Sequence, residues 1–339
     1  MQGNKIVTGS LVIIVIFIGG VVLKLAQPVL FPFFLAIFLS FVLSPLLKLF
    51  TRWKIPRAIS IIFILFLTFL VIYLMGSLFY SSGKSFASEF PQYGEKISSI
   101  LNSIQEGLKL PEVEWENIDW AEQLNMNRLG SILRSALGPF FTFFSNLFLI
   151  LIFLVFILAG RGKTRIKISN AFSESHSGQI IGVIDKIDVQ IQRYLAIKTV
   201  VSIVTGVFAT IVLLSFGVDF AIVFGFLTFL LNYIPNVGSV IATAFPVIIA
   251  LFQFDTPWTA LWVLLILFSI QLVMGNLVEP RLMGEGLGLS PLVILFFLFF
   301  WGWLWGIPGM LLAVPLAAII KIVCNNIPSL KFVAELMSK

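Results

Sequence analysis

The chain has 339 residues, of which 59% are hydrophobic and 11% are charged, and its mean hydropathy is +1.06. Soluble domains contain about 25% charged residues, so this composition excludes a soluble protein and predicts a chain that crosses a membrane several times. The net charge of +6 does not indicate nucleic-acid binding, because the basic residues flank apolar segments, as they do at the cytoplasmic ends of membrane helices.

Six apolar segments reach the roughly 17 to 25 residues that a membrane-spanning helix needs. They lie at about 6–23, 25–47, 58–80, 135–160, 199–218 and 256–278. The first follows Lys5 and superficially resembles a signal peptide, but it lacks a convincing cleavage site and a second apolar segment follows at once. We therefore expect it to be the first membrane helix, and we expect residues 1–80 to form N-terminal scaffold spans.

The charges between these segments predict the side of the membrane that each loop faces. Residues 48–57 contain four basic and no acidic residues, and residues 161–198 contain seven basic and three acidic residues, which is typical of cytoplasmic segments. Residues 81–134, with eight acidic and five basic residues, are expected outside. The alternation places both termini in the cytoplasm, with a cytoplasmic tail at 326–339.

Two of these loops show helical periodicity. In the outer segment this predicts amphipathic helices that lie against the membrane or a neighbouring subunit, or else a small external cap that binds no ligand. The periodic residues are Ile97, Ile100, Leu101, Ile104 and Leu108, and then Leu129, Ile132, Leu133 and Leu137. The cytoplasmic linker at 161–198 is expected to be a docking helix that could transmit motion, with one face made of Ile180, Ile184, Ile187 and Ile191.

Two charge-free stretches of 35 residues, Phe220 to Phe254 and Gly286 to Ile320, are each interrupted near the middle by proline and glycine. One helix of that length would span about 52 Å, against a hydrocarbon core of about 30 Å, so each stretch predicts two short helices that meet at a bend inside the membrane. The bends fall at 232–238 and 305–309. Unwound backbone at membrane depth must face a cavity or protein, so such a pair predicts the binding site of a transporter.

The same plan occurs twice in residues 199–325, which are expected to form the transport region. The span at 199–218 precedes the first broken stretch, and the span at 256–278 precedes the second with the opposite orientation, which predicts an inverted repeat. Two pairs of short, tilted full spans would satisfy the same loop charges. We therefore expect an all-α, polytopic membrane protein with about six full spans and two re-entrant or broken helical hairpins.

The hairpin tips and the span at 256–278 supply the candidate site residues. Free backbone groups at the tips could coordinate a polar solute, and polar side chains add donors and acceptors. The candidate substrate-binding residues are Asn232, Pro235, Asn236, Gly238 and Ser239 at the first tip, Gly306, Pro308 and Gly309 at the second, and Gln271 and Asn276 in the span. The alternative is that these groups only satisfy one another and the broken backbone.

Glu279 and Arg281 form an acid and base pair beside an apolar segment. An ionisable residue at membrane depth is a functional candidate, so Glu279 could carry a coupling proton or take part in ion coupling with Arg281. The alternative is a structural pair at the cytoplasmic interface, because Gly284, Glu285 and Gly286 follow closely and indicate a solvated turn.

No residue pattern indicates a cofactor, a metal site or an enzyme. The single cysteine, Cys324, excludes an internal disulfide and a cysteine metal cluster, and the only histidine, His176, lies in a polar stretch where a solvated position is expected. An intramembrane hydrolase would need a base or metal ligands beside a nucleophile, and the sequence has neither a zinc-binding helix motif nor a second histidine.

The sequence resembles the autoinducer-2 exporter family, also called the AI-2E family of transporters. In the C-terminal part the resemblance rests on the run NLVEPRLMGEGLGLSP at 276–291, on WGWLWG at 301–306, on AVP at 313–315, and on Pro235 and Gly238. It covers nearly the whole chain through Pro28, Pro45, the IPR run at 55–57 and the RYL run at 193–195.

The resemblance implies a multi-pass protein of the bacterial inner membrane that exports autoinducer-2, a furanone-type quorum-sensing signal, as a homopentamer with an elevator-like movement. Its partners would be membrane lipids and a small hydrophilic solute. Glu279 departs from the family pattern, in which an uncharged residue often precedes the proline. We expect a secondary transporter that moves a small hydrophilic molecule outward. The alternatives are a sodium(lithium)/proton antiporter, as some relatives are reported to be, and a membrane scaffold that transports nothing.

Overall fold

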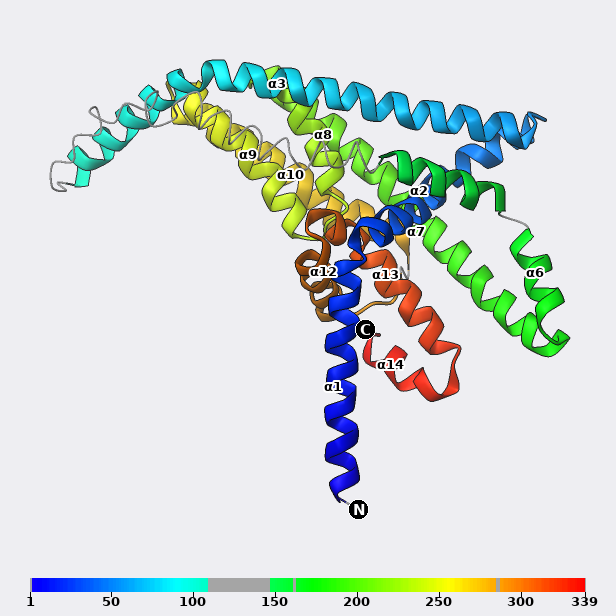
Figure 1. The fold of residues 1–339 in the computed structure, drawn as a ribbon. Coiled ribbons are helices and arrows are strands. Elements are labelled where there is room, and N and C mark those ends of the chain that lie inside the picture. Colours follow the sequence, from blue (N-terminus) through cyan, green and yellow to red (C-terminus); the bar gives the residue numbers. More distant parts are fainter. Residues whose placement is uncertain (1, 109–146, 161–162, 285–286, 339) are drawn as a thin grey trace. The chain divides into compact units, whose positions relative to one another are not determined.

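The computed structural model describes residues 2–108, 147–160, 163–284 and 287–338. Within these ranges the regular secondary structure is helical, and the β interaction present is an isolated antiparallel bridge between Leu289 and Ser338. The prediction of an all-α protein is therefore confirmed (Figure 1). The chain divides into two compact units.

The first unit contains the described residues up to Leu65, those from 147 to Thr199 and those from Pro280 onward. Its helices are α1 (Gln2–Leu25), α2 (Gln27–Arg52), the start of α3 (Arg57–Leu108), a helix at Leu147–Gly160, α6 (Lys163–Ala171), the first part of α7 (Glu174–Phe216), most of α11 (Glu279–Met283), α12 (Pro291–Trp305), α13 (Ile307–Asn325), η3 (Pro328–Leu330) and α14 (Lys331–Leu336). The second unit contains the rest of α3 and α7, then α8 (Ala221–Leu231), α9 (Val237–Gln253), α10 (Pro257–Val273) and the π-helical η2 (Met274–Val278).

Five helices of the described residues are long and apolar enough to cross a membrane. They are Gln27–Arg52, Arg57–Phe86, His176–Phe216, Pro257–Met283 and Ile307–Asn325, and the bent pair Leu147–Gly160 and Lys163–Ala171 would add a sixth. The prediction of a polytopic membrane protein is confirmed. The inverted repeat and the re-entrant course of the hairpins stay predictions.

Two helices continue past the ends of the apolar segments that predicted them. α3 runs without a break from the expected span at 58–80 into the outer segment, and α7 joins the expected linker helix to the span at 199–218 (Figure 1). α3 ends later than its apolar run and α7 begins before its apolar run, because Lys, Glu and Gln in these extensions are good helix formers. The periodic side chains at 97–108 and 129–137 lie outside the side chains that the structure describes.

Each broken stretch forms two helices, as predicted. Residues 232–236 separate α8 from α9, and Gly306 alone separates α12 from α13. Pro235 lies in the first bend, and Pro308 occupies the first turn of α13, where a missing N–H costs no hydrogen bond. α8, with 11 residues, is only about 16 Å long, whereas α13, with 19 residues, reaches about 28 Å.

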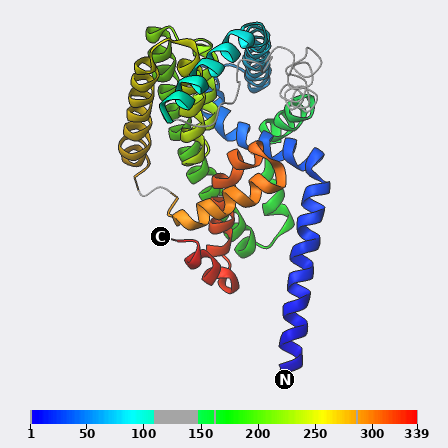
Figure 2. The same ribbon diagram turned by 90° about the vertical axis from the view of Figure 1, so that its left-hand side faces the viewer.

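Each unit has its own closely packed core. In the second unit α7, α8, α9 and α10 surround a cluster in which Leu213, Ala250 and Val263 are fully buried. In the first unit Ile191 of α7 and Ala317 of α13 are fully buried in a cluster that also includes residues of α2 and α14. Figure 2 shows α14, in red, folded back beside α13. Because lipid is as apolar as leucine, close packing rather than exclusion from water holds such helices together.

Candidate functional site

In the second unit a pair of glycines brings α7 and α8 into backbone contact. A Cβ atom added to Gly206 of α7 would lie 2.7 Å from the carbonyl oxygen of Gly225 and 3.0 Å from Cβ of Phe229, both on α8. Small residues let helices approach closely in a membrane, where dispersion contacts stabilise their association. The crossing fixes the position of two threonines beside these glycines, Thr205 and Thr228, which line the same pocket.

The polar side chains of the first bend are engaged in local hydrogen bonds. The amide of Asn232 donates to Oγ of Ser202 on α7 at 3.0 Å, and both residues are buried. The hydroxyl of Ser239 donates to the carbonyl oxygen of Asn236 at 2.8 Å, while Asn236 itself is exposed and has a φ of +60°. These bonds tie the bend to α7 and satisfy part of its broken backbone.

Both bends are closed in the same way, by a glycine packed against a carbonyl group of the preceding helix. A Cβ on Gly238 would overlap the carbonyl oxygen of Leu231, and a Cβ on Gly309 would overlap that of Trp301. Gly306, which forms the second bend, has φ +69° and ψ −153°, a conformation that essentially only glycine adopts. These glycines therefore have a packing role in the bends, and their part in substrate binding stays a prediction.

The second hairpin contains a buried hydrogen-bond donor that meets no acceptor. Nε1 of Trp301, on α12, is buried and has no hydrogen-bond partner among the described residues. Its neighbour Trp305, whose ring centroid lies 4.6 Å away, donates instead to the carbonyl oxygen of Leu23 at 3.3 Å. An unmet buried donor costs about 1–3 kcal/mol, so this group needs a reason to be there.

The candidate residues of the two tips belong to different compact units. Gly306, Pro308 and Gly309 lie in the first, and the other candidate substrate-binding residues, at 232–239 and at 271 and 276, lie in the second. That both tips contribute to one site stays a prediction.

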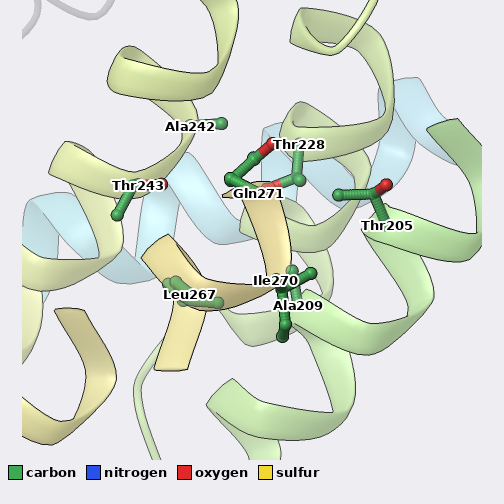
Figure 3. A pocket seen from close by; sticks show the side chains of 8 residues that line it. All are labelled: Thr205, Ala209, Thr228, Ala242, Thr243, Leu267, Ile270 and Gln271. Atoms are coloured by element: carbon green, nitrogen blue, oxygen red, sulfur yellow. The ribbon is translucent and has the colours of Figure 1, made fainter. Parts of the chain in front are cut away.

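Within the second unit, the side chain of Gln271 extends into a narrow polar pocket between four helices (Figure 3). The pocket is lined by Thr205 and Ala209 of α7, Thr228 of α8, Ala242 and Thr243 of α9, and Leu267, Ile270 and Gln271 of α10. Sequence reasoning named Gln271 but missed the three threonines, although Thr228 and Thr243 stand out as polar residues in the first charge-free stretch.

The pocket threonines differ in their hydrogen bonds. Thr205 donates its hydroxyl proton to the carbonyl oxygen of Val201 at 2.7 Å, and Thr228 donates to that of Phe224 at 2.8 Å. Since a hydroxyl has one proton and two lone pairs, these two oxygens can only accept further bonds. Thr243 is 7% exposed, and its hydroxyl finds no hydrogen-bond partner within the described part of the chain.

Gln271 and its neighbours occupy the region where α10 changes its winding. Gln271 lies in the last turn of α10, directly before η2, and π-helical turns of this kind occur frequently at functional sites. Asn276, within η2, is exposed and does not line the pocket. Glu279 is half-buried at the start of α11, and Arg281 is exposed, so the coupling role predicted for this pair stays a prediction.

A buried cation on α7 was missed from the sequence. Lys198 is only 4% exposed and lies on the same helical face as the fully buried Ile191 and Leu195. Its charge was assigned to the cytoplasmic basic set, but its spacing of three residues from Leu195 and seven from Ile191 places it on the buried face. Spacing along the helix was therefore the signal that could have found it.

Comparison of the sequence with known proteins identifies the family to which the chain belongs. The sequence matches the family described as AI-2E family transporter over residues 11–329. It is 33% identical over 338 residues to the AI-2 transport protein TqsA of Escherichia coli, and the alignment covers 100% of this chain and 96% of TqsA. A protein of Borreliella burgdorferi, named only provisionally as a transport protein, is 34% identical over 322 residues, which cover 95% of this chain and 87% of that protein. The chain belongs to the AI-2E family of transporters, and it is a multi-pass membrane transport protein.

Proposed function

We propose that this protein is a secondary transporter that exports autoinducer-2 or a similar small hydrophilic molecule across the bacterial inner membrane. The observation that carries the proposal is the 33% identity to the AI-2 transport protein TqsA along the full chain. The family supports transport in general, and the name of TqsA supports the solute.

The chemistry of the second unit suits an uncharged polar solute. Among the side chains of this unit that the structure describes, the buried polar ones bear hydroxyl and amide groups and no charge: Ser202, Thr205, Thr228, Asn232 and Thr243. Hydroxyl and amide groups can exchange hydrogen bonds with the hydroxyl and carbonyl groups of a small solute. They do so without burying an ion, which would need a partner of opposite charge.

The unmet indole N–H of Trp301 supports a contact at the second hairpin. A solute that carries oxygen atoms would provide the acceptor that the described residues do not. The loss of one such hydrogen bond costs about 1 kcal/mol, which corresponds to a several-fold loss of transport efficiency. Trp301 is therefore a sharper probe of solute contact than the tip residues whose side chains are already engaged.

The proposal includes an elevator-like movement in a homo-oligomer, a pentamer by family resemblance, with both termini in the cytoplasm. The second hairpin packs against α1 and α2 inside the first unit, through Trp305 and Phe31 among others. That residues 1–80 form the scaffold spans stays a prediction. In our proposal the moving body is therefore the second unit, which carries the first hairpin and the polar pocket.

The test is flux from liposomes. Purified full-length protein is reconstituted in liposomes loaded with autoinducer-2, and efflux is followed with and without an imposed proton gradient. We expect efflux above that of empty liposomes, dependent on the gradient, and reduced several-fold by Trp301→Phe, which removes the N–H and keeps an aromatic ring. Trp303→Phe is the matched control, because the Trp303 side chain is exposed on the same helix.

Failure of the folded protein to release autoinducer-2 would refute the proposal that autoinducer-2 is the exported solute. Equal efflux from Trp301→Phe and Trp303→Phe would refute the contact at the second hairpin. If the protein is instead a membrane scaffold, we expect no gradient-dependent release of any solute, even from folded protein that elutes as one species.

A further inference from the structure

We infer that α14 is an interfacial helix whose exposed apolar side, formed by Phe332 and Leu336, lies in the lipid at the membrane surface where α13 ends. The partner of this side is the bilayer and not another protein chain. The inference goes beyond the proposed function, because it concerns the C-terminal segment and holds for any exported solute and for either side of the membrane.

The segment after α13 turns back along that helix (Figure 2). Residues 326–330, which include η3, are all that separates α13 from α14. Beyond α14 the chain meets the loop that precedes α12. The main-chain N–H of Ser290 donates to the carbonyl oxygen of Met337 at 3.0 Å. Leu289 pairs with Ser338 in the antiparallel bridge. The C-terminal segment is therefore held at the base of the second hairpin.

The loop that holds this segment is tied to α13 within its last two turns. Nζ of Lys321 donates to the carbonyl oxygen of Gly288 at 2.6 Å and to that of Leu287 at 3.4 Å. Lys321 lies four residues before Asn325, where α13 ends, which is a rise of about 6 Å. α13 is long and apolar enough to cross a membrane, and its length of about 28 Å matches a hydrocarbon core of about 30 Å. α14 therefore lies beside the end of a membrane-spanning helix, at the depth of the lipid headgroups.

The side chains of α14 form three sides around the helix. Met337, just after α14, is buried in the cluster that includes residues of α7 and α13, which fixes the inner side. Phe332 and Leu336 are four residues apart and so share one outer side, where they are 63% and 74% exposed. Lys331 and Glu335 share the next side and are also exposed. A helix with a protein side, an apolar side and a charged side suits the boundary between protein, lipid and water.

Lipid accounts for the apolar side better than a second copy of the chain does. The large apolar side chains exposed after α13 in the described residues are Ile327, Leu330, Phe332 and Leu336. A stable protein interface takes about 20–30 residues from each partner, so this surface is too small to be one by itself. The bilayer around α13 already lies beside it, and interfacial helices bury their apolar side at the boundary of headgroups and acyl chains.

The experiment places an NBD fluorophore on single cysteines of the full-length protein in lipid nanodiscs. Cys324, the only cysteine of the chain, is first replaced by alanine. Phe332→Cys and Leu336→Cys carry the label on the apolar side, and Lys331→Cys and Glu335→Cys are matched controls on the charged side. All four side chains are exposed, so their replacement leaves the core intact. The fluorescence is quenched either by lipids with a doxyl group near the top of the acyl chain or by iodide in the water.

We expect the doxyl lipid to quench labels on the apolar side several-fold more strongly than labels on the charged side, and iodide to show the reverse order. Equal quenching of the two sides by iodide would overturn the inference, because α14 would then stand in water. Labels on the apolar side that neither quencher reaches would also overturn it, because a protein chain would then cover them. The assay contains no solute, so its failure leaves the export proposal standing, and failure of autoinducer-2 efflux leaves the lipid contact standing.

Discussion

The contact between α7 and α8 predicts the effect of adding a single carbon atom. In Gly206→Ala the new Cβ would lie 2.7 Å from the carbonyl oxygen of Gly225, 3.0 Å from Cβ of Phe229 and 3.3 Å from its backbone nitrogen. Carbon atoms in optimal contact are about 3.5–4.0 Å apart. The crowded atoms belong to the α8 backbone or its first side-chain carbon, so no rotamer change relieves them, and the two helices must separate.

The magnitude follows from a matched pair on the same helix. Overpacking a closely packed site costs about 1–3 kcal/mol, while alanine is favoured over glycine in a helix by up to about 1 kcal/mol. Gly182, also on α7, has no atom within 4 Å of the position a Cβ would take. Gly182→Ala therefore gains the helix propensity of alanine without a clash. The difference between the two variants cancels that gain, and Gly206→Ala should be less stable than Gly182→Ala by about 1–3 kcal/mol.

The assay is unfolding of the purified full-length variants in mixed micelles, titrated with SDS and followed by circular dichroism. Equal midpoints and slopes for the two variants would refute the argument, because they would mean that α7 and α8 do not meet at these glycines. Gly225→Ala should also be destabilised. The hydroxyl of Thr210 can rotate away from the new Cβ at the loss of one hydrogen bond, but the Cβ of Thr210 and the carbonyl oxygen of Gly206, each 2.9 Å from the new atom, cannot.

Three further substitutions test the hairpins by the same unfolding measurement. Gly309→Ala should destabilise by about 1–3 kcal/mol, because its Cβ would overlap the carbonyl oxygen of Trp301; a fully stable variant would contradict the packing of this bend. Trp301→Phe removes an unmet donor, which favours stability by about 1–3 kcal/mol, but it also leaves a small cavity in the core, which costs a similar amount, so stability should stay within about 1 kcal/mol of the parent; a loss larger than about 3 kcal/mol would mean that the N–H has a partner. Ser202→Ala should cost about 1–3 kcal/mol of stability, because it leaves the buried Asn232 amide without its acceptor. Ser215→Ala removes an exposed hydroxyl from the same helix and should cost little. Equal effects of the two substitutions would refute a structural role for the hydrogen bond between Asn232 and Ser202.

The sequence was sufficient to predict where the two apolar stretches break. Proline lacks an N–H, and glycine accepts backbone conformations and contacts that other residues do not, so Pro235 and Gly238, and Pro308 and Gly309, mark each bend locally. The apolar segments were not sufficient to place the end of α3 or the start of α7. Hydropathy reports which residues suit lipid, and a helix continues wherever its next residues have good helical propensity, so the apolar run and the helix end at different places.

The pocket was missed because hydroxyl residues in apolar helices usually bond to their own backbone and reveal nothing by spacing. Thr205 and Thr228 do so. Only the packing of four helices shows that their remaining lone pairs, the Thr243 hydroxyl and the Gln271 amide line one hollow. Lys198 was missed for a different reason, since positive charges near a membrane boundary serve orientation so often that one on a buried helical face is counted with the rest.

The construction of the two bends limits how a transport movement can occur. In each, a glycine after the bend is packed against a carbonyl group of the helix before it, so opening the bend would separate atoms that are in backbone contact. In the first, the buried bond between Asn232 and Ser202 also holds the bend to α7. Interiors packed in this way switch between discrete arrangements more readily than they deform. If the hairpins move during transport, each therefore moves as a body with the helices it is packed against, and the hinges lie outside the bends.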